Sequence, residues 1–167
     1  MKEKQDNIKT IRRASAVGLW GSVAAVIVTV LFIYASPWRF YPSAYTSRWM
    51  LVSGTVLAVL AVSMTLLTVR RRIPQLRQAE ELEYKLDGYA AHVRSLYGTL
   101  LTVVVLLCAF TLLSARSVLL MLAIVTVLVL FLNYPNLYRV KVDLGLTDEE
   151  MRSLYGDRYI AGDSNEE

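Results

Sequence analysis

The sequence contains few of the residue types from which catalytic and metal sites are built. It has one cysteine, Cys108, and one histidine, His92, among 167 residues. A single cysteine excludes a disulfide within the chain, and one histidine with no cysteine or second histidine nearby gives no zinc-ligand spacing. No glycine-rich phosphate-binding loop is present. We therefore expect no cofactor, no bound metal and no enzymatic activity, and we expect His92 to be solvated or at the level of lipid headgroups.

Charged residues and histidine are absent from four long stretches, residues 14–35, 49–69, 97–115 and 117–134. A helix needs about 20 apolar residues to cross a hydrocarbon core about 30 Å thick. The whole chain is 55% hydrophobic with a mean hydropathy of +0.43, which exceeds the composition of ordinary soluble domains. The sequence predicts an all-α membrane protein with four transmembrane helices in two antiparallel hairpins.

The basic residues are distributed unevenly between the two sides of this predicted bundle. Of the 18 lysines and arginines, five precede the first stretch, six lie in residues 70–96 and four follow the fourth stretch. An excess of positive charge marks the cytoplasmic side of a membrane protein. Both termini and the long loop are therefore expected in the cytoplasm, where the basic side chains would face anionic lipid. The positive net charge is thereby explained without nucleic-acid binding.

Small residues recur at helical spacing in the first two stretches. Side chains of this size let helix backbones approach closely, which favours association where lipid replaces water. We expect these residues to pack within the bundle, with a homo-oligomer interface as the alternative. The residues concerned are Gly18, Ser22, Gly21 and Ala25 in the first stretch and Gly54, Ala58 and Ala61 in the second.

Aromatic and arginine side chains flank the apolar stretches. The outer connection, residues 36–48, combines aromatic residues with two prolines and is expected to form an aromatic belt at the headgroups. Three consecutive arginines follow the second stretch and are expected at the opposite headgroup layer. The predicted interface residues are Trp38, Tyr41, Trp49, Arg70, Arg71 and Arg72.

The cytoplasmic loop carries an amphipathic pattern. Apolar residues recur at three and four after Pro74, which predicts a helix over residues 74–86 with Gly88 as a hinge. A straight helix continuing into the third stretch would place Pro74 about 35 Å above the membrane, too far from the end of the second stretch. Either the second span extends into an antiparallel helical stalk, or the loop helix lies on the membrane surface; we favour the surface helix.

The C-terminal region has two different patterns. Residues 138–144 alternate apolar and polar side chains, which predicts a short strand. Thr147 with Glu150 forms a capping-box sequence that predicts a short helix after it. Neither element is large enough to fold alone, so we expect the region to dock on a protein partner. The predicted docking residues are Tyr138, Val140, Val142, Leu144, Met151, Leu154 and Tyr155.

These features favour a non-catalytic membrane scaffold, assembly factor or accessory subunit, which binds a protein partner through the cytoplasmic loop and the C-terminal segment. The alternative is a small oligomeric transporter or channel for lipid or neutral solutes. No ionisable residue lies within the predicted spans, although ion-coupled transporters commonly place one there. A transporter requires a polar cavity that reaches the middle of the bilayer, whereas a scaffold requires only a filled bundle.

Overall fold

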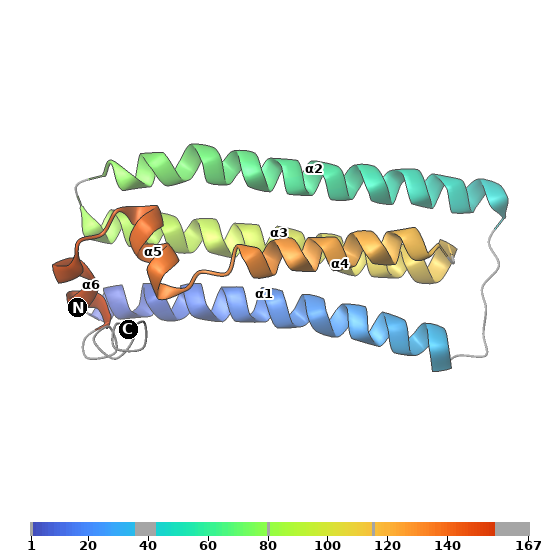
Figure 1. The fold of residues 1–167 in the computed structure, drawn as a ribbon, viewed down its shortest axis with the longest axis horizontal. Coiled ribbons are helices and arrows are strands. Elements are labelled where there is room, and N and C mark those ends of the chain that lie inside the picture. Colours follow the sequence, from blue (N-terminus) through green and yellow to red (C-terminus); the bar gives the residue numbers. More distant parts are fainter. Residues whose placement is uncertain (1, 36–42, 80, 115, 156–167) are drawn as a thin grey trace, which may run out of the picture.

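In the computed structural model, residues 2–35, 43–79, 81–114 and 116–155 are described, and they form six helices and no strand. The all-α class is thereby confirmed for this part of the chain. Three helices are long and apolar enough to cross a membrane, or four if α4 and α5 are counted as one bent span. The helices, drawn in Figure 1, are α1 (Lys2–Ala35), α2 (Ala44–Arg77), α3 (Leu82–Ser114), α4 (Ser117–Leu132), α5 (Leu137–Leu144) and α6 (Asp148–Tyr155).

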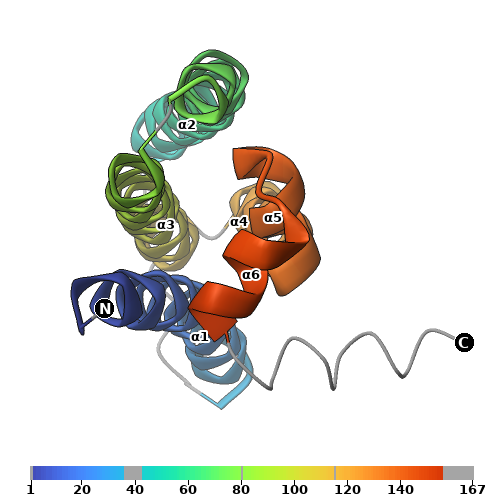
Figure 2. The ribbon, with the colours of Figure 1, turned by 90° about the vertical axis from the view of Figure 1, so that its left-hand side faces the viewer.

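Helix α3 is the centre of the bundle and packs against α1, α2 and α4. Figure 2 shows α1 and α2 on opposite sides of α3. Of the most apolar stretch of α3, 44% is buried, against 22% for α1 and 17% for α2. Helices α3 and α4 form a packed antiparallel hairpin. Helices α1 and α2 do not pack against each other as a second hairpin, because α3 lies between them. The outer faces of α1, α2 and α4 leave large apolar side chains exposed, as expected where lipid is the solvent.

Small residues lie where the helices approach most closely. A Cβ atom added to Gly18 would stand 2.7 Å from the Cβ of Tyr97 on α3, and one added to Gly54 would stand 2.7 Å from Cδ2 of Leu119 on α4. At Gly21 the corresponding distance to Cδ1 of Leu101 is 3.3 Å. The other small residues of both patterns also face the bundle: Ser22, Ala58 and Ala61 are buried and Ala25 is half-buried.

Hydroxyl groups inside the bundle bond to their own helices. Ser22 Oγ donates to the Gly18 carbonyl at 2.7 Å, and Thr126 Oγ1 donates to the Leu122 carbonyl at 2.8 Å. Such bonds satisfy a serine or threonine without a partner on another helix. Among the described residues, no buried side-chain nitrogen or oxygen lacks a hydrogen-bond partner. These hydroxyl groups therefore need no polar partner from another helix.

The loop between α2 and α3 differs from the favoured surface helix. Helix α2 continues through Pro74 to Arg77, and α3 begins at Leu82, so the two helices form the antiparallel stalk that was the alternative. Gly88 is not a hinge but lies within α3, where an added Cβ would stand 2.5 Å from Cδ2 of Leu76. This close contact gives the end of α2 a packing partner. A 34-residue helix is about 50 Å long, some 20 Å more than a hydrocarbon core requires.

The predicted strand over residues 138–144 is wrong, because the structure has α5 there. The Asn136 side chain accepts a hydrogen bond from the Arg139 backbone N–H at 2.7 Å, and Gly145 ends the helix with φ 61°. Val140 and Leu144, four residues apart, are both buried. In so short a segment a period of two also places apolar residues four apart, and a single strand has no hydrogen-bonding partner. The caps at Asn136 and Gly145 therefore favour the helix over the strand.

Replacing Gly18 by alanine tests the contact between α1 and α3. The added methyl group meets the Cβ of Tyr97, which no rotation of the tyrosine side chain can move. We expect a loss of about 1–3 kcal/mol in unfolding free energy, as for other overpacked interiors. The measurement is the thermal unfolding midpoint in detergent.

Gly98→Ala is the matched control, since no heavy atom lies within 4 Å of the position of its added Cβ. It should leave the midpoint unchanged or raise it, because alanine is up to about 1 kcal/mol better than glycine in a helix. Equal midpoints for both variants would contradict the close approach of α1 and α3.

Candidate functional site at the α4–α5 junction

The chain bends by 75° between α4 and α5, and polar side chains gather at this bend. Pro135 lies in the four-residue connection and lacks the backbone N–H that a continued helix requires. Asn133 is the C-cap of α4, and its Nδ2 donates to the Val129 carbonyl at 2.7 Å. Asn136 is the N-cap of α5. The two asparagines therefore end one helix and begin the next.

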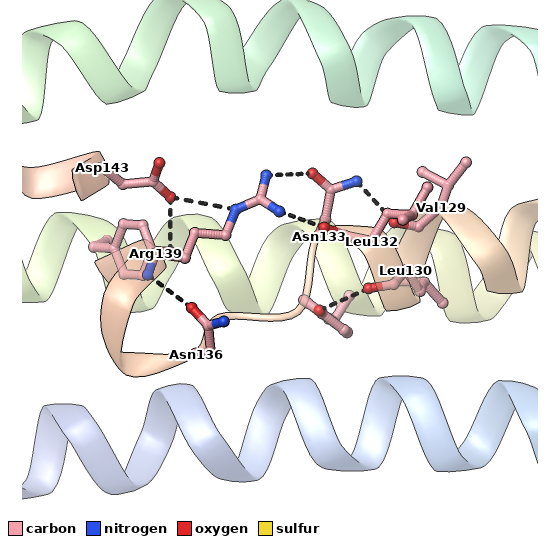
Figure 3. A network of polar contacts seen from close by, with 9 residues as sticks. Val129, Leu130, Leu132, Asn133, Asn136, Arg139 and Asp143 are labelled. Carbon is pink, nitrogen blue, oxygen red and sulfur yellow. Dashed lines mark hydrogen bonds and ion pairs between the residues drawn. The ribbon is translucent and has the colours of Figure 1, made fainter. Parts of the chain in front are cut away.

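Arg139 joins the two sides of the bend, as Figure 3 shows. Its guanidinium donates from Nη2 to Oδ1 of Asn133 at 2.9 Å and from Nη1 to the Leu132 carbonyl at the end of α4. Its Nε lies 3.7 Å from Oδ2 of Asp143, one turn further along α5. A planar guanidinium offers five N–H donors in fixed directions, which suits contact with several acceptors at once. Arg139 thus holds the angle between the helices.

Two buried tyrosines of α3 attach the bend to the bundle. Tyr89 donates from its hydroxyl to Oδ2 of Asp143 at 3.1 Å, and Tyr97 donates to the Leu130 carbonyl at 3.0 Å. Burial, and next the negative charge of Asp143, raise the pKa of Tyr89 above its usual value. Tyr89 therefore remains a protonated donor at physiological pH. Helix α3 contacts both sides of the bend through these two hydroxyl groups.

Helix α6 begins with the predicted capping box, which is confirmed. The Thr147 backbone N–H donates to Oε2 of Glu150 at 2.8 Å, and the Glu150 N–H donates to Oγ1 of Thr147 at 3.3 Å. The bond from the Thr147 N–H lowers the pKa of the Glu150 carboxyl. Lys141 of α5 and Asp148 of α6 form an ion pair at 2.5 Å. These contacts hold α6 beside α5, near the start of α1 (Figure 1).

The predicted docking residues divide into two groups. Four of them, Val140, Leu144, Met151 and Leu154, are buried within the chain itself and are not available to a partner. Packing within the folded chain, including that of α5 against α2, covers these four, which the sequence pattern could not reveal. Tyr138 and Val142, four residues apart on α5, are 74% and 49% exposed. Tyr155 is the last residue of α6, and its side chain lies outside the described residues.

The predicted interface residues lie at two different places. Arg70, Arg71 and Arg72 are all exposed, on the part of α2 that belongs to the stalk. Trp49 is exposed near the start of α2, where its ring meets that of Tyr45 edge-on at 6.0 Å. Trp38 and Tyr41 fall outside the described residues.

A polar contact fixes the end of the bundle that lies opposite the stalk. Arg116, in the connection between α3 and α4, donates from Nε to Oγ of Ser47 at 2.9 Å. Ser47 in turn donates to the Ser114 carbonyl at 3.3 Å. The start of α2 is thereby held against the turn between α3 and α4.

His92 is not solvated, contrary to the sequence-based expectation, because only 5% of its surface is exposed. Burial, followed by the positive charge of Arg72, lowers the pKa of its imidazole, and Asp143 partly opposes this. The ring is therefore neutral near pH 7. Within the described part of the chain, no group of three or more histidine, cysteine, aspartate or glutamate side chains is placed to hold a metal ion.

Comparisons with protein-family models, with curated proteins and with solved structures give no match. The class of this protein rests on the fold and the junction themselves. It is a helical-bundle protein with three or four apolar helices that could span a membrane. At one end, a stalk of α2 and α3 carries the two short helices α5 and α6.

Removal of the Tyr89 hydroxyl tests the attachment of α5. Tyr89→Phe leaves Asp143 without its donor from α3, and a hydrogen bond to a charged group contributes about 1.5–3 kcal/mol. We expect backbone amides of α5 to exchange with solvent at least about 10-fold faster. Hydrogen exchange followed by mass spectrometry measures this. Tyr84→Phe on the exposed face of α3 is the control, and equal exchange in both variants would argue against the attachment.

The pH dependence of stability tests the environment of His92. The folded protein binds a proton there less readily than the unfolded chain, whose pKa is near 6.5. Stability should therefore decline as the pH falls below about 6.5, until the folded-state pKa is passed. The measurement is the thermal midpoint at pH 7.5 and 5.5 in a zwitterionic detergent. His92→Gln should reduce the difference between the two midpoints, and an unchanged difference would refute the assignment.

Proposed function

We propose that this protein is a non-catalytic membrane scaffold or accessory subunit that binds a protein partner at its α5 helix. The observation that carries the proposal is the exposure of Tyr138 and Val142 on a helix whose opposite face is locked into the chain. Val140 and Leu144 are buried, and Asp143 is tied to α3 and to Arg139. A rigid, exposed tyrosine next to an aliphatic side chain is a typical anchor for a protein interface.

The proposed orientation places the stalk, α5 and α6 in the cytoplasm. Support comes from the arginines, because Arg12 and Arg13 precede the apolar part of α1, Arg70–72 follow that of α2, and Arg139 follows α4. Those helix ends lie at one end of the bundle (Figure 1). Positive residues concentrate on the cytoplasmic side of membrane proteins. In this orientation α5 lies close to the membrane surface, within reach of both soluble and membrane-bound partners.

The alternative, an oligomeric transporter of lipid or neutral solutes, has less support. The interior is filled by side chains such as Leu100, Val104, Leu107, Leu119 and Leu130, all fully buried. A hollow of about 440 Å³ is lined by residues of α2 and α3 alone, so it does not lie among all four long helices. A scaffold requires no passage through the bundle.

Photo-crosslinking in native membranes tests the proposal. A photoreactive amino acid is placed at Tyr138, and the crosslinked products are separated by size. We expect a discrete protein adduct that is lost when Val142→Asp is added, because a carboxylate would be desolvated in the interface. The shift in adduct mass, with identification by mass spectrometry, is the measurement.

The matched control places the same amino acid at Tyr45, which is 71% exposed at the opposite end of the bundle. The same adduct from both positions, or adducts to lipid alone at position 138, would contradict a specific partner at α5. Deleting α5 would be a poor test, because it would also remove the buried Val140 and Leu144.

A further inference from the structure

A groove runs between α2 and α3 and is not explained by bundle packing. Its cavity volume is about 440 Å³. It lies between two close helix contacts, Leu76 against Gly88 at the stalk and Gly54 near Leu107 further along, where an added Cβ would be 3.4 Å from Cδ2 of Leu107. We call it the α2–α3 groove and define it by six of its lining residues: Leu57, Leu60 and Thr68 of α2, and His92, Ser95 and Val103 of α3.

The lining changes from polar to apolar along the groove. Because α2 and α3 are antiparallel, Thr68 lies at the same end as His92 and Ser95, next to the stalk. Leu57, Leu60 and Val103 line the other end, within the predicted spans. One end of the groove therefore offers hydroxyl and imidazole groups, and the other offers only aliphatic surface. A soluble anion would gain nothing from the aliphatic end.

His92 is the buried polar residue at the stalk end of the groove. It is 95% buried, since 5% of its surface is exposed, yet no hydrogen bond to it is found among the described residues. Its two ring nitrogens therefore keep some exposed surface, because no fully buried, unpaired nitrogen is found among the described residues, and His92 lines the groove. A neutral imidazole has one N–H donor and one acceptor nitrogen. The ring can donate one hydrogen bond to an occupant of the groove.

Arg72 supplies positive charge at the stalk end of the groove. It follows Thr68 by four residues, so it lies one turn further on the same face of α2. Burial and then the positive charge of Arg72 lower the pKa of His92, and the negative charge of Asp143 opposes them with a smaller effect. The same field that disfavours an imidazolium favours an anion between the two side chains. Guanidinium groups bind phosphate oxygens through parallel hydrogen bonds.

We propose that the α2–α3 groove binds one anionic phospholipid of the stalk-side leaflet. The phosphate group accepts hydrogen bonds from Arg72, His92 and the hydroxyl of Ser95, while an acyl chain lies along Leu57, Leu60 and Val103. A bound lipid of this kind fills the space that α2 leaves beside α3. The site goes beyond the scaffold function, because it involves neither α5 nor a protein partner.

Native mass spectrometry of the full chain tests headgroup recognition. The protein is released from nanodiscs that contain equal amounts of phosphatidylglycerol and phosphatidylcholine, and the retained lipids are counted by mass. We expect one retained phosphatidylglycerol for the wild type. Arg72→Gln should lower that occupancy about fivefold, the effect of one basic side chain at a membrane surface.

Arg70→Gln is the matched control. It removes the same charge from the same part of α2, but a two-residue step turns the side chain about 200° away from Arg72. Both arginines are exposed, so neither substitution should prevent folding. Equal loss of phosphatidylglycerol in the two variants, or none in either, would overturn the site, since only general charge attraction would remain.

Methyl NMR tests the position of the acyl chain. Met64 lines the groove and is 62% exposed, while Met121 on α4 is 64% exposed and lies away from it. Nanodiscs contain a small fraction of lipid with a nitroxide on its acyl chain, carried either by phosphatidylglycerol or by phosphatidylcholine. We expect the phosphatidylglycerol label to broaden the Met64 methyl signal more than the phosphatidylcholine label does. At Met121 the two labels should act equally.

Equal broadening by both labels at Met64 would overturn the proposal and indicate ordinary surrounding lipid. A third arm titrates glycerol phosphate, which has the headgroup but no acyl chain. Saturable shifts of the single histidine, His92, with this compound would also overturn it in favour of a soluble phosphate ligand. Loss of the crosslink at Tyr138 with retained phosphatidylglycerol binding would leave this site intact, so the two proposals fail independently.

Discussion

The packing of α3 against three other long helices is the constraint on which the rest of the structure depends. Helix α1 approaches it closely because Gly18 has no side chain to displace Tyr97, and α4 runs back along it from a turn of two residues. In lipid, apolar surface gains little by leaving its solvent, so close packing must supply the association energy. Glycine, alanine and serine at the crossing points make that packing possible, and the outer faces remain free for lipid.

The same central helix organises the end of the bundle that carries the short helices. Beyond the level of α4, α3 continues as half of the stalk and offers Tyr89 to the carboxylate of Asp143. Arg139 and the two capping asparagines convert the end of α4 into a sharp bend, so α5 turns across the bundle instead of extending it. The buried faces of α5 and α6 then complete the packing. Of the large apolar side chains of α5, Leu137, Tyr138 and Val142 remain exposed.

The α2–α3 groove also follows from how the helices pack. Between Gly54 and Leu76 the buried side chains of α2 are the small ones of Ala58, Ala61 and Thr65, and α2 is the least buried of the long helices. Between its two close contacts it leaves room that no protein side chain occupies. A lipid in that room would replace missing side-chain packing, and its phosphate would give His92 the partner that the described residues do not provide. The proposed scaffold function and the proposed lipid site thus use different faces of one bundle.

The sequence by itself determined the all-α class and the positions of the apolar helices. In a chain this apolar, an uncharged stretch of about 20 residues indicates a helix that is long enough to span a membrane. It also located the α6 capping box, since a cap depends on residues three apart. Only the tertiary structure decided the form of the stalk, the helical state of α5 and the burial of Val140, Leu144 and His92. Each depends on contacts between segments distant in the chain, such as Leu76 with Gly88 and Tyr89 with Asp143, and periodicity within one segment carries no information about them.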